Sequence, residues 1–225
     1  MLVDFALQRS LELCLCGVHP RNLFALAPDY LPKKRDDITY IPRLLYSGHG
    51  SQAMLEASKF SAVEILRDGR KIEIRALKSD DRAGLIAAVG RASTQSLYRR
   101  FFGVKREFSE KEIAFFVNID FVKHVALVAV ADEGGQGKIV GGGRYVLVRP
   151  GTAEVAFAVI DEYQGQGIGL ALMRHLVTLA RAAGLKGFIA EVLPDNRAML
   201  KVFEKCGLEL RKRRDRQVVY VTLQL

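Results

Sequence analysis

Apolar residues along most of the chain recur with the two periods that distinguish strands from helices. Residues 71–77 alternate polar and apolar side chains, which predicts a half-buried strand. Residues 125–131 and 153–160 are almost continuously apolar, as buried strands are. A glycine-rich turn follows the first of these, and residues 139–148 read as its partner strand. Residues 187–193 form a further apolar run, so the chain carries at least five candidate strands before its last helix.

Helix signals fall between these strands. One apolar stripe predicts a helix from about Gly167 to Ala183, ended by Gly184; its members are Ile168, Leu172, Leu176, Leu179 and Ala183. Ser109 and Glu112 form a capping box that opens another helix, over residues 109–119. Further helices are predicted at residues 79–89, 95–102 and 196–206. Because no strand-helix-strand repeat runs the full length, a doubly wound parallel sheet is disfavoured.

Residues 1–53 differ from the rest of the chain. They contain four of the six prolines and no long periodic segment, although residues 1–15 are compatible with one short helix. We therefore expect two parts, an irregular or partly helical extension at residues 1–53 and a compact domain at residues 54–225.

Charge is concentrated near the C-terminus. The formal net charge is +9, which favours acidic partners, and much of the excess lies in residues 211–216. That run separates two strand-like segments, residues 208–210 and 218–223. We interpret it as the solvated end of a hairpin in preference to a nucleic-acid patch.

The cysteines and the hydropathy pattern bear on location. Three cysteines, an odd number, argue against a disulfide framework. Cys14 and Cys16, with His19 nearby, lack a second ligand pair, so no metal is expected. No run reaches the roughly 18–20 apolar residues of a membrane span, and no basic segment precedes the apolar N-terminus. A cytoplasmic protein that does not enter a membrane is the expectation.

A glycine-rich loop joins the strand at residues 153–160 to the helix that starts near Gly167. Glycine lets backbone N–H groups approach a ligand, and a helix N-terminus adds unpaired N–H groups and a positive dipole end. These features predict a phosphate or pyrophosphate site. The loop lacks the Lys-Ser or Lys-Thr of a Walker A motif, and Leu170 and Leu172 stand where a dinucleotide fingerprint requires a small residue.

The pattern Gln-x-x-Gly-x-Gly, at Gln164, Gly167 and Gly169, resembles the acyl-CoA pyrophosphate loop of the GNAT superfamily of N-acyltransferases. The strand at residues 153–160, Asn196, and the closing Phe-Glu-Lys-Cys-Gly-Leu at residues 203–208 resemble further parts of that family. The resemblance covers about residues 70–225. It implies an α+β fold of three layers, with a mixed, mostly antiparallel central sheet flanked by helices. Two parallel central strands are expected to splay apart where the cofactor enters.

The resemblance also implies a site that uses acetyl-CoA as cosubstrate and no metal. Glu154 is the expected general base. The expected cofactor-binding residues are Ala158, Val159, Ile160, Gln164, Gly165, Gln166, Gly167, Ile168, Gly169, Asn196 and Phe203. Glu154 and Ala158 are about 13 Å apart along a strand, so we expect an ordered water and a local bulge to assist proton transfer. Many relatives have a tyrosine acid where this chain has Phe203, which leaves the general acid unassigned. Tyr163, water or solvent could serve instead, or the CoA thiolate could leave without being protonated.

A second resemblance concerns the part of the family fold that binds the acceptor of the acyl group. Residues 96–102, 108–112 and 125–129 resemble the catalytic domain of bacterial protein lysine acetyltransferases, which act on metabolic enzymes such as acyl-CoA synthetases. This implies a protein lysine acceptor, with Arg99 and Arg100 either holding an acidic protein surface or solvated. Two alternatives stay open: an N-acetyltransferase of a small amine, amino acid or aminoglycoside, and a non-catalytic CoA-sensing or nucleic-acid-binding module. The chain is expected to be a monomer or a homodimer.

Overall fold

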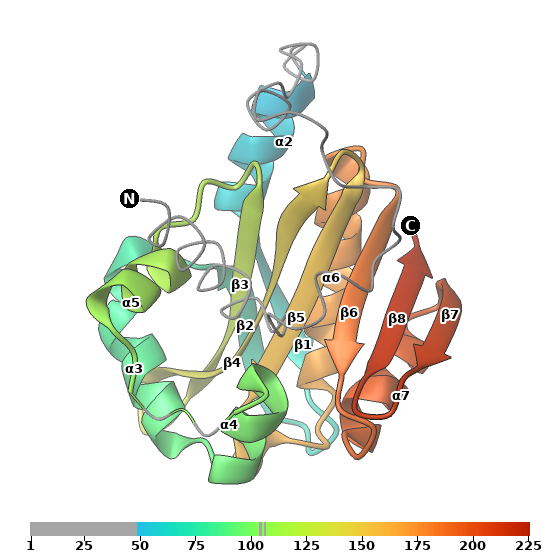
Figure 1. Cartoon of the computed structure of the whole chain (residues 1–225). Coiled ribbons are helices and arrows are strands. Elements are labelled where there is room, and N and C mark those ends of the chain that lie inside the picture. The colour runs from blue at the N-terminus through green and yellow to red at the C-terminus, as the bar shows by residue number, and fades with distance from the viewer. Residues whose placement is uncertain (1–48, 104, 106) are drawn as a thin grey trace, which may run out of the picture.

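The computed structural model of the protein describes residues 49–103, 105 and 107–225 (Figure 1). The helix expected at residues 1–15 and the Cys14, Cys16 and His19 group lie outside the described residues. The expected domain boundary between residues 53 and 54 falls inside the first described helix, α2 (His49–Ser58).

The described residues form helices and strands in the following order along the chain. After α2 come β1 (Ser61–Ile65), β2 (Lys71–Ala76), the 3-10 turn η3 (Ser79–Asp81), α3 (Arg82–Arg91), α4 (Thr94–Phe101), α5 (Glu110–Val117), β3 (His124–Asp132), β4 (Gly137–Arg149), β5 (Thr152–Val159), the 3-10 turn η4 (Asp161–Tyr163), α6 (Ile168–Ala182), β6 (Gly187–Val192), α7 (Arg197–Lys205), β7 (Glu209–Arg214) and β8 (Val219–Gln224). None of these helices has the length and apolar character needed to span a membrane.

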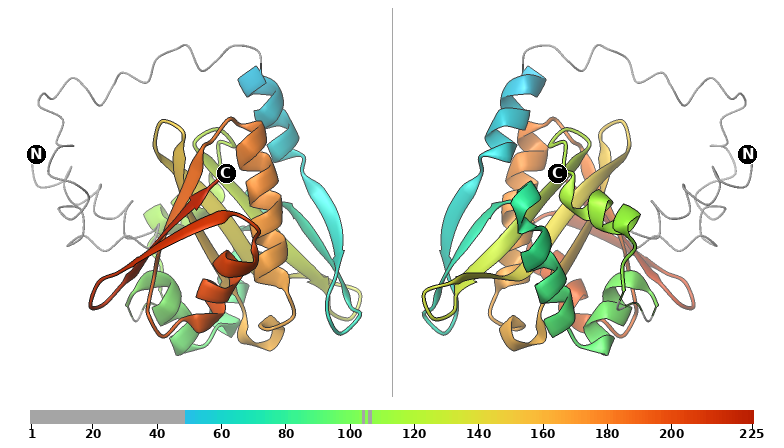
Figure 2. Two further views of the ribbon diagram at one scale, coloured as in Figure 1. Left: turned by 90° about the vertical axis from the view of Figure 1, so that its right-hand side faces the viewer. Right: turned by 90° about the vertical axis from the view of Figure 1, so that its left-hand side faces the viewer.

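The predicted three-layer α+β architecture is confirmed. The strands form one sheet in the order β1-β2-β3-β4-β5-β6-β8-β7, and every neighbouring pair is antiparallel except β5 and β6. Figure 2 shows α6 and α7 along one face of the sheet and α3 to α5 on the other. The main core lies under α6, where Leu172, Met173 and Leu176 are fully buried.

The two central parallel strands pair over a very short length. Their contacts comprise Thr152 with Gly187, Ala153 with Phe188, and Glu154 with Ile189. Beyond Glu154, β5 runs on to Val159 and β6 to Val192 without pairing to each other. The sheet therefore opens between them immediately after Glu154, as the family resemblance implied.

Two strands differ from the sequence interpretation. β1 was not predicted. Val63 and Ile65 on this edge strand are 68% and 69% exposed, so its sequence lacks the apolar pattern of a strand that packs on the core. The basic run was interpreted as a hairpin end, but Arg211 to Arg214 lie within β7 and pair with β8. Lys and Arg side chains suit an exposed edge strand, where their charge opposes pairing with another chain.

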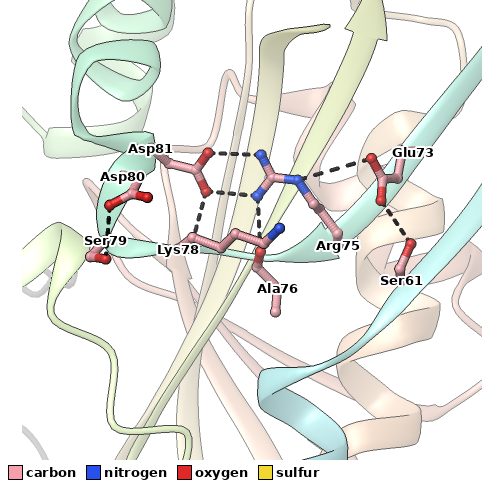
Figure 3. A network of polar contacts seen from close by, with 8 residues as sticks. All are labelled: Ser61, Glu73, Arg75, Ala76, Lys78, Ser79, Asp80 and Asp81. Atoms are coloured by element: carbon pink, nitrogen blue, oxygen red, sulfur yellow. Dashed lines mark hydrogen bonds and ion pairs between the residues drawn. The ribbon is translucent and has the colours of Figure 1, made fainter.

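A polar network fixes the start of α3 against the end of β2 (Figure 3). The Arg75 guanidinium donates two hydrogen bonds of 2.7 Å to the Asp81 carboxylate. Asp81 also accepts from the backbone N–H of Lys78. Burial raises the pKa of Asp81, but the bonds from Arg75 and Lys78 outweigh it and keep the pKa below the ordinary value. This largely buried bidentate pair sets where the helices of the second face begin.

The triplet Gly141, Gly142 and Gly143 in β4 allows close packing under α6. A Cβ at Gly143 would lie 2.7 Å from the buried Phe157 ring and 3.2 Å from Leu176. A Cβ at Gly142, on the other face, would meet only the Leu127 carbonyl oxygen, at 3.4 Å. The pairing of β3 and β4 also shifts register between Ala129 and Val130, which is a bulge beside the triplet.

We expect Gly143→Ala to lower the free energy of unfolding by about 1–3 kcal/mol, because the buried ring cannot move away from an added methyl group. Gly142→Ala is the matched control and should stay within about 1 kcal/mol of the wild type. Urea unfolding of the two variants measures the difference. Equal effects of the two substitutions would contradict the assignment of Phe157 as the obstacle.

Candidate active site

The loop between β5 and α6 takes the backbone conformation that its glycines permit. Gly165 and Gly167 have φ angles of +77° and +102°, in the left-handed region that favours glycine. A Cβ built on either residue would meet nothing within 4 Å, so backbone conformation, not packing, requires glycine there. The first turn of α6 starts at Ile168 and presents N–H groups that no helical carbonyl can accept. These groups fit a phosphate anion.

Gly169 lies where α6 packs on α7. A Cβ at this position would lie 3.4 Å from Val202 of α7, which is an ordinary van der Waals contact. Packing alone therefore does not require glycine at this position.

Side-chain hydrogen bonds hold the start of the loop against α4. The Asp161 carboxylate accepts from the backbone N–H of Ser93 at 2.8 Å and from the hydroxyls of Ser93 and Ser96. Gln164 donates from Nε2 to the Ser96 hydroxyl and to the Val159 carbonyl, both at 2.9 Å. The Gln164 amide nitrogen thus positions the loop through these two bonds.

A second set of contacts holds the rest of the loop. Arg91 forms ion pairs with both Glu133 and Glu162, and Arg67 donates to the Gly165 carbonyl. The Tyr163 hydroxyl donates to Glu133 at 3.0 Å, and the side chain is buried. With its proton committed to Glu133, Tyr163 is not placed to protonate a leaving group in the opening between β5 and β6.

Helix α4 bridges the ends of the two separated strands. Ser93 and Ser96 bind Asp161, which follows β5. On the same helix, Arg99 forms an ion pair of 3.1 Å with Asp195, which follows β6. Arg99 therefore has a partner within the protein, while 33% of its side chain remains exposed.

The backbone of β5 directs alternate amides into the opening. The N–H of Ile160 donates to the Val140 carbonyl on β4, so this amide is not available as an oxyanion donor. In an antiparallel ladder, alternate residues turn both polar groups to the same neighbour. Ala158 therefore also faces β4, while the N–H groups of Phe157 and Val159 point towards the opening. The pairing of β5 with β4 is continuous from Glu154 to Val159, so the expected bulge between Glu154 and Ala158 is absent.

Glu154 sits at the point where β5 and β6 separate. The residue is only 5% exposed, so it is not an ordinary solvent-exposed strand carboxylate. Its Oε2 atom has no hydrogen-bond partner among the described residues. Burial raises the pKa of Glu154 to about 8; the positive charge of Arg100 opposes this rise and the negative charge of Glu191 adds to it. A buried carboxyl group with such a pKa is suited to accept a proton near neutral pH.

Asn196 and Phe203, two further residues predicted to bind the cofactor, make contacts within the protein. Asn196 caps α7 by accepting from the N–H of Met199 at 3.2 Å. Phe203 is 1% exposed and packs edge-on against Phe157 with ring centroids 6.2 Å apart.

Sequence reasoning missed Glu191 and the cluster around His124. Glu191 is a lone carboxylate in an otherwise apolar strand, the same signal that singled out Glu154. His124 is buried against Phe115, its Nε2 lies 3.1 Å from Arg144 Nη1, and burial lowers its pKa to about 3. Arginine can only donate, so this histidine is neutral and accepts at Nε2.

Comparisons with known proteins agree with this geometry. The sequence profile described as the acetyltransferase (GNAT) family matches residues 91–208. An acetyltransferase of Pseudomonas aeruginosa is 36% identical over 138 residues, which is 61% of this chain and 74% of that protein. The acetyltransferase Pat of Mycolicibacterium smegmatis is 39% identical over 119 residues, which is 51% of this chain and only 34% of that protein.

A solved structure shares the fold over most of the chain. The GNAT domain of S. lividans PAT superposes with a TM-score of 0.67 and 33% sequence identity. The match covers 80% of this chain and 99% of that domain.

We expect Glu154→Gln to change how stability depends on pH. Between the ordinary glutamate pKa of 4.5 and the folded value of about 8, the folded wild type keeps a proton that the unfolded chain has released. Wild-type stability should therefore fall as pH rises through this window, by up to about 1.4 kcal/mol per pH unit. The variant lacks this term, so its advantage over the wild type grows with pH.

Urea unfolding at several pH values between 5 and 9 measures this difference. Glu73→Gln makes the same chemical change at a side chain that is 44% exposed and serves as control. Parallel pH profiles for the wild type and Glu154→Gln would contradict a buried, protonated carboxyl group.

Proposed function

The chain belongs to the GNAT acetyltransferase family and is an N-acetyltransferase, and we propose that it transfers acetyl groups from acetyl-CoA to lysine side chains of proteins, with Glu154 as general base. The observation that carries the proposal is the burial of Glu154 where β5 and β6 separate, on the strand that leads directly into the glycine-rich loop.

The residues around the loop fit the donor. The unpaired N–H groups at the start of α6 and the adjacent amides of Gly165, Gln166 and Gly167 would hold a pyrophosphate. Val159 and Phe157 direct their amides to the opening, where they can bind the amide-containing arm or polarise a thioester carbonyl. When bound, acetyl-CoA supplies an activated acyl group. The bonds that hold Asp161 and Gln164 keep this cradle in place before the donor arrives.

Glu154 removes a proton from the acceptor. An alkylammonium has an ordinary pKa of about 10.4, so the amine must be deprotonated before it can attack. Burial makes the Glu154 carboxylate a stronger base than an exposed glutamate. Phe157 and Val159, whose amides face the opening, lie three and five residues beyond Glu154, or roughly 10 and 16 Å along the strand, so a water is required between the carboxylate and the amine.

Protein lysine as the acceptor is supported by the relatives. The S. lividans PAT domain and the Mycolicibacterium Pat protein are among the proteins most similar to this chain. The stretch at residues 96–102 that carries the second resemblance forms α4, which lies across the ends of β5 and β6. A cytoplasmic setting, where acetyl-CoA and lysine-bearing enzymes meet, follows as part of the proposal.

The acceptor class can be tested with labelled acetyl-CoA and a desalted bacterial lysate, with small amines added back in a parallel tube. We expect label in discrete protein bands, at lysine residues identified by mass. Label that enters only the small-molecule fraction would replace the protein acceptor with a free amine. Binding of acetyl-CoA without any transfer would leave a non-catalytic module.

Glu154→Gln should lower turnover by roughly 100-fold or more and leave the affinity for acetyl-CoA nearly unchanged, because the donor does not need the base in order to bind. Wild-type kcat/KM should rise with pH through about 8, as Glu154 loses its proton, and the residual activity of the variant should lack this step. Steady-state kinetics and calorimetric titration with acetyl-CoA measure the two effects. Glu73→Gln should behave as wild type. Unchanged turnover in Glu154→Gln would remove this residue from the mechanism.

A further inference from the structure

The sheet face that carries Glu154 continues across β6, β8 and β7. Among the described helices, α7 lies on the opposite face of these strands, and none covers this face over β8 and β7 (Figure 1). Glu154 pairs with Ile189, and Glu191 follows two positions later on the same face. Glu191 pairs with Tyr220, and Tyr220 pairs with Arg213. Directly paired residues share a face. Glu191, Tyr220 and Arg213 therefore form one row across three strands, and Glu154 lies on the same face in the neighbouring row, which continues through Ile189 and Thr222 to Arg211.

Across this face, from β5 to β7, the side chains change from acidic to basic and from buried to exposed. Glu154 is buried, Glu191 and Tyr220 are half-buried, and Arg213 is exposed. The Arg213 guanidinium lies 4.7 Å from the centroid of the Tyr220 ring, which confirms that the two side chains meet on this face. Arg211 lies two positions before Arg213 and adds a second exposed guanidinium at the outer end, where Glu209 partly offsets its charge at 3.0 Å.

The other basic residues of β7 point the opposite way. Lys212 forms an ion pair of 2.7 Å with Glu204 on α7, so it lies on the face that α7 covers. Arg214 shares that face by strand alternation. β7 therefore carries two basic side chains on each face, Arg211 and Arg213 on one and Lys212 and Arg214 on the other. Of these four, only Arg211 and Arg213 share a face with Glu154.

We propose that the face formed by β6, β8 and β7 is the docking surface for the acceptor protein, and that it selects lysines with acidic residues nearby. The inference rests on the proposed function. The Glu191 side chain, and the Glu154 carboxylate once it has lost its proton, attract the lysine ammonium to the inner end of this face. Arg211 and Arg213 bind an Asp or Glu side chain of the same acceptor at the outer end.

The spacing of the strands sets the position of the acidic residue. Glu154 and Arg211 are three strands apart in the same row, or about 14 Å at about 4.8 Å per strand, and Arg213 lies two residues further along β7. An extended peptide advances about 3.3–3.4 Å per residue. The favoured acidic residue therefore lies about four or five positions from the lysine in an extended acceptor, or at the same distance on a folded surface.

The test compares two lysine peptides that differ only in having Asp and Glu, or Asn and Gln, at the fourth and fifth positions from the lysine on each side. The whole chain is assayed as wild type, as Arg211→Gln/Arg213→Gln, and as Lys212→Gln/Arg214→Gln. Both double variants remove two positive charges from the same exposed strand, so they differ only in the face that they change.

We expect the wild type and Lys212→Gln/Arg214→Gln to prefer the acidic peptide by about tenfold in kcat/KM, since two exposed charge pairs each contribute a few-fold. Arg211→Gln/Arg213→Gln should lose most of this preference. Raising the salt concentration should weaken the preference, because exposed charges are screened.

Other outcomes would overturn the inference. Equal acetylation of the two peptides by the wild type, or the same loss in both double variants, would reject the docking surface and leave lysine acetylation standing. Acetylation of a small amine but of neither peptide would reject the proposed function together with this inference.

Discussion

Two central strands of this protein run parallel and stay in contact for only three residue pairs. Beyond these pairs, the edge of β5 that faces β6 has no strand partner among the described residues. Backbone N–H and C=O groups on such an edge inside a protein require hydrogen-bond partners. An extended ligand that carries amides and phosphates can provide them along the strand and at the helix start beyond it. The short contact is therefore the constraint from which the donor cradle, the position of Glu154 and the open face of β6, β8 and β7 all follow.

A sheet that opens in its middle needs a second connection to stay in register, and α4 provides it. Through Ser93 and Ser96 the helix holds Asp161 at one strand end, and through Arg99 it holds Asp195 at the other. The same helix orients Gln164, and its Arg100 lowers the pKa of Glu154 against the effect of burial. One short helix thus connects the geometry of the opening to the electrostatics of Glu154.

The sequence predicts those parts of the protein whose signals are local. The capping box at Ser109, the apolar stripe of α6 and the positive φ of Gly184 need only neighbouring residues, and the structure has all three. Contacts between residues distant in sequence were not predicted. They are the contacts of Arg99 with Asp195, of Tyr163 with Glu133, and of the Ile160 backbone N–H with the Val140 carbonyl. β1 and β7 were missed or misread because edge strands carry little apolar pattern. Glu154 was recognised from its family motif, whereas its burial depends on packing that no local pattern contains.

The contacts of α4 also set the order in which the site can form during synthesis of the chain. Ser96 binds a residue 65 positions further on, and Arg99 binds one 96 positions further on. Synthesis at about 5–20 residues per second leaves this helix without either partner for several seconds. Contacts of such long sequence separation form late in folding. The nascent chain therefore gains all the contacts of α4 only after α6, β6 and the loop beyond β6 have emerged, so the opening between β5 and β6 is fully assembled only once Asp195 has been synthesised.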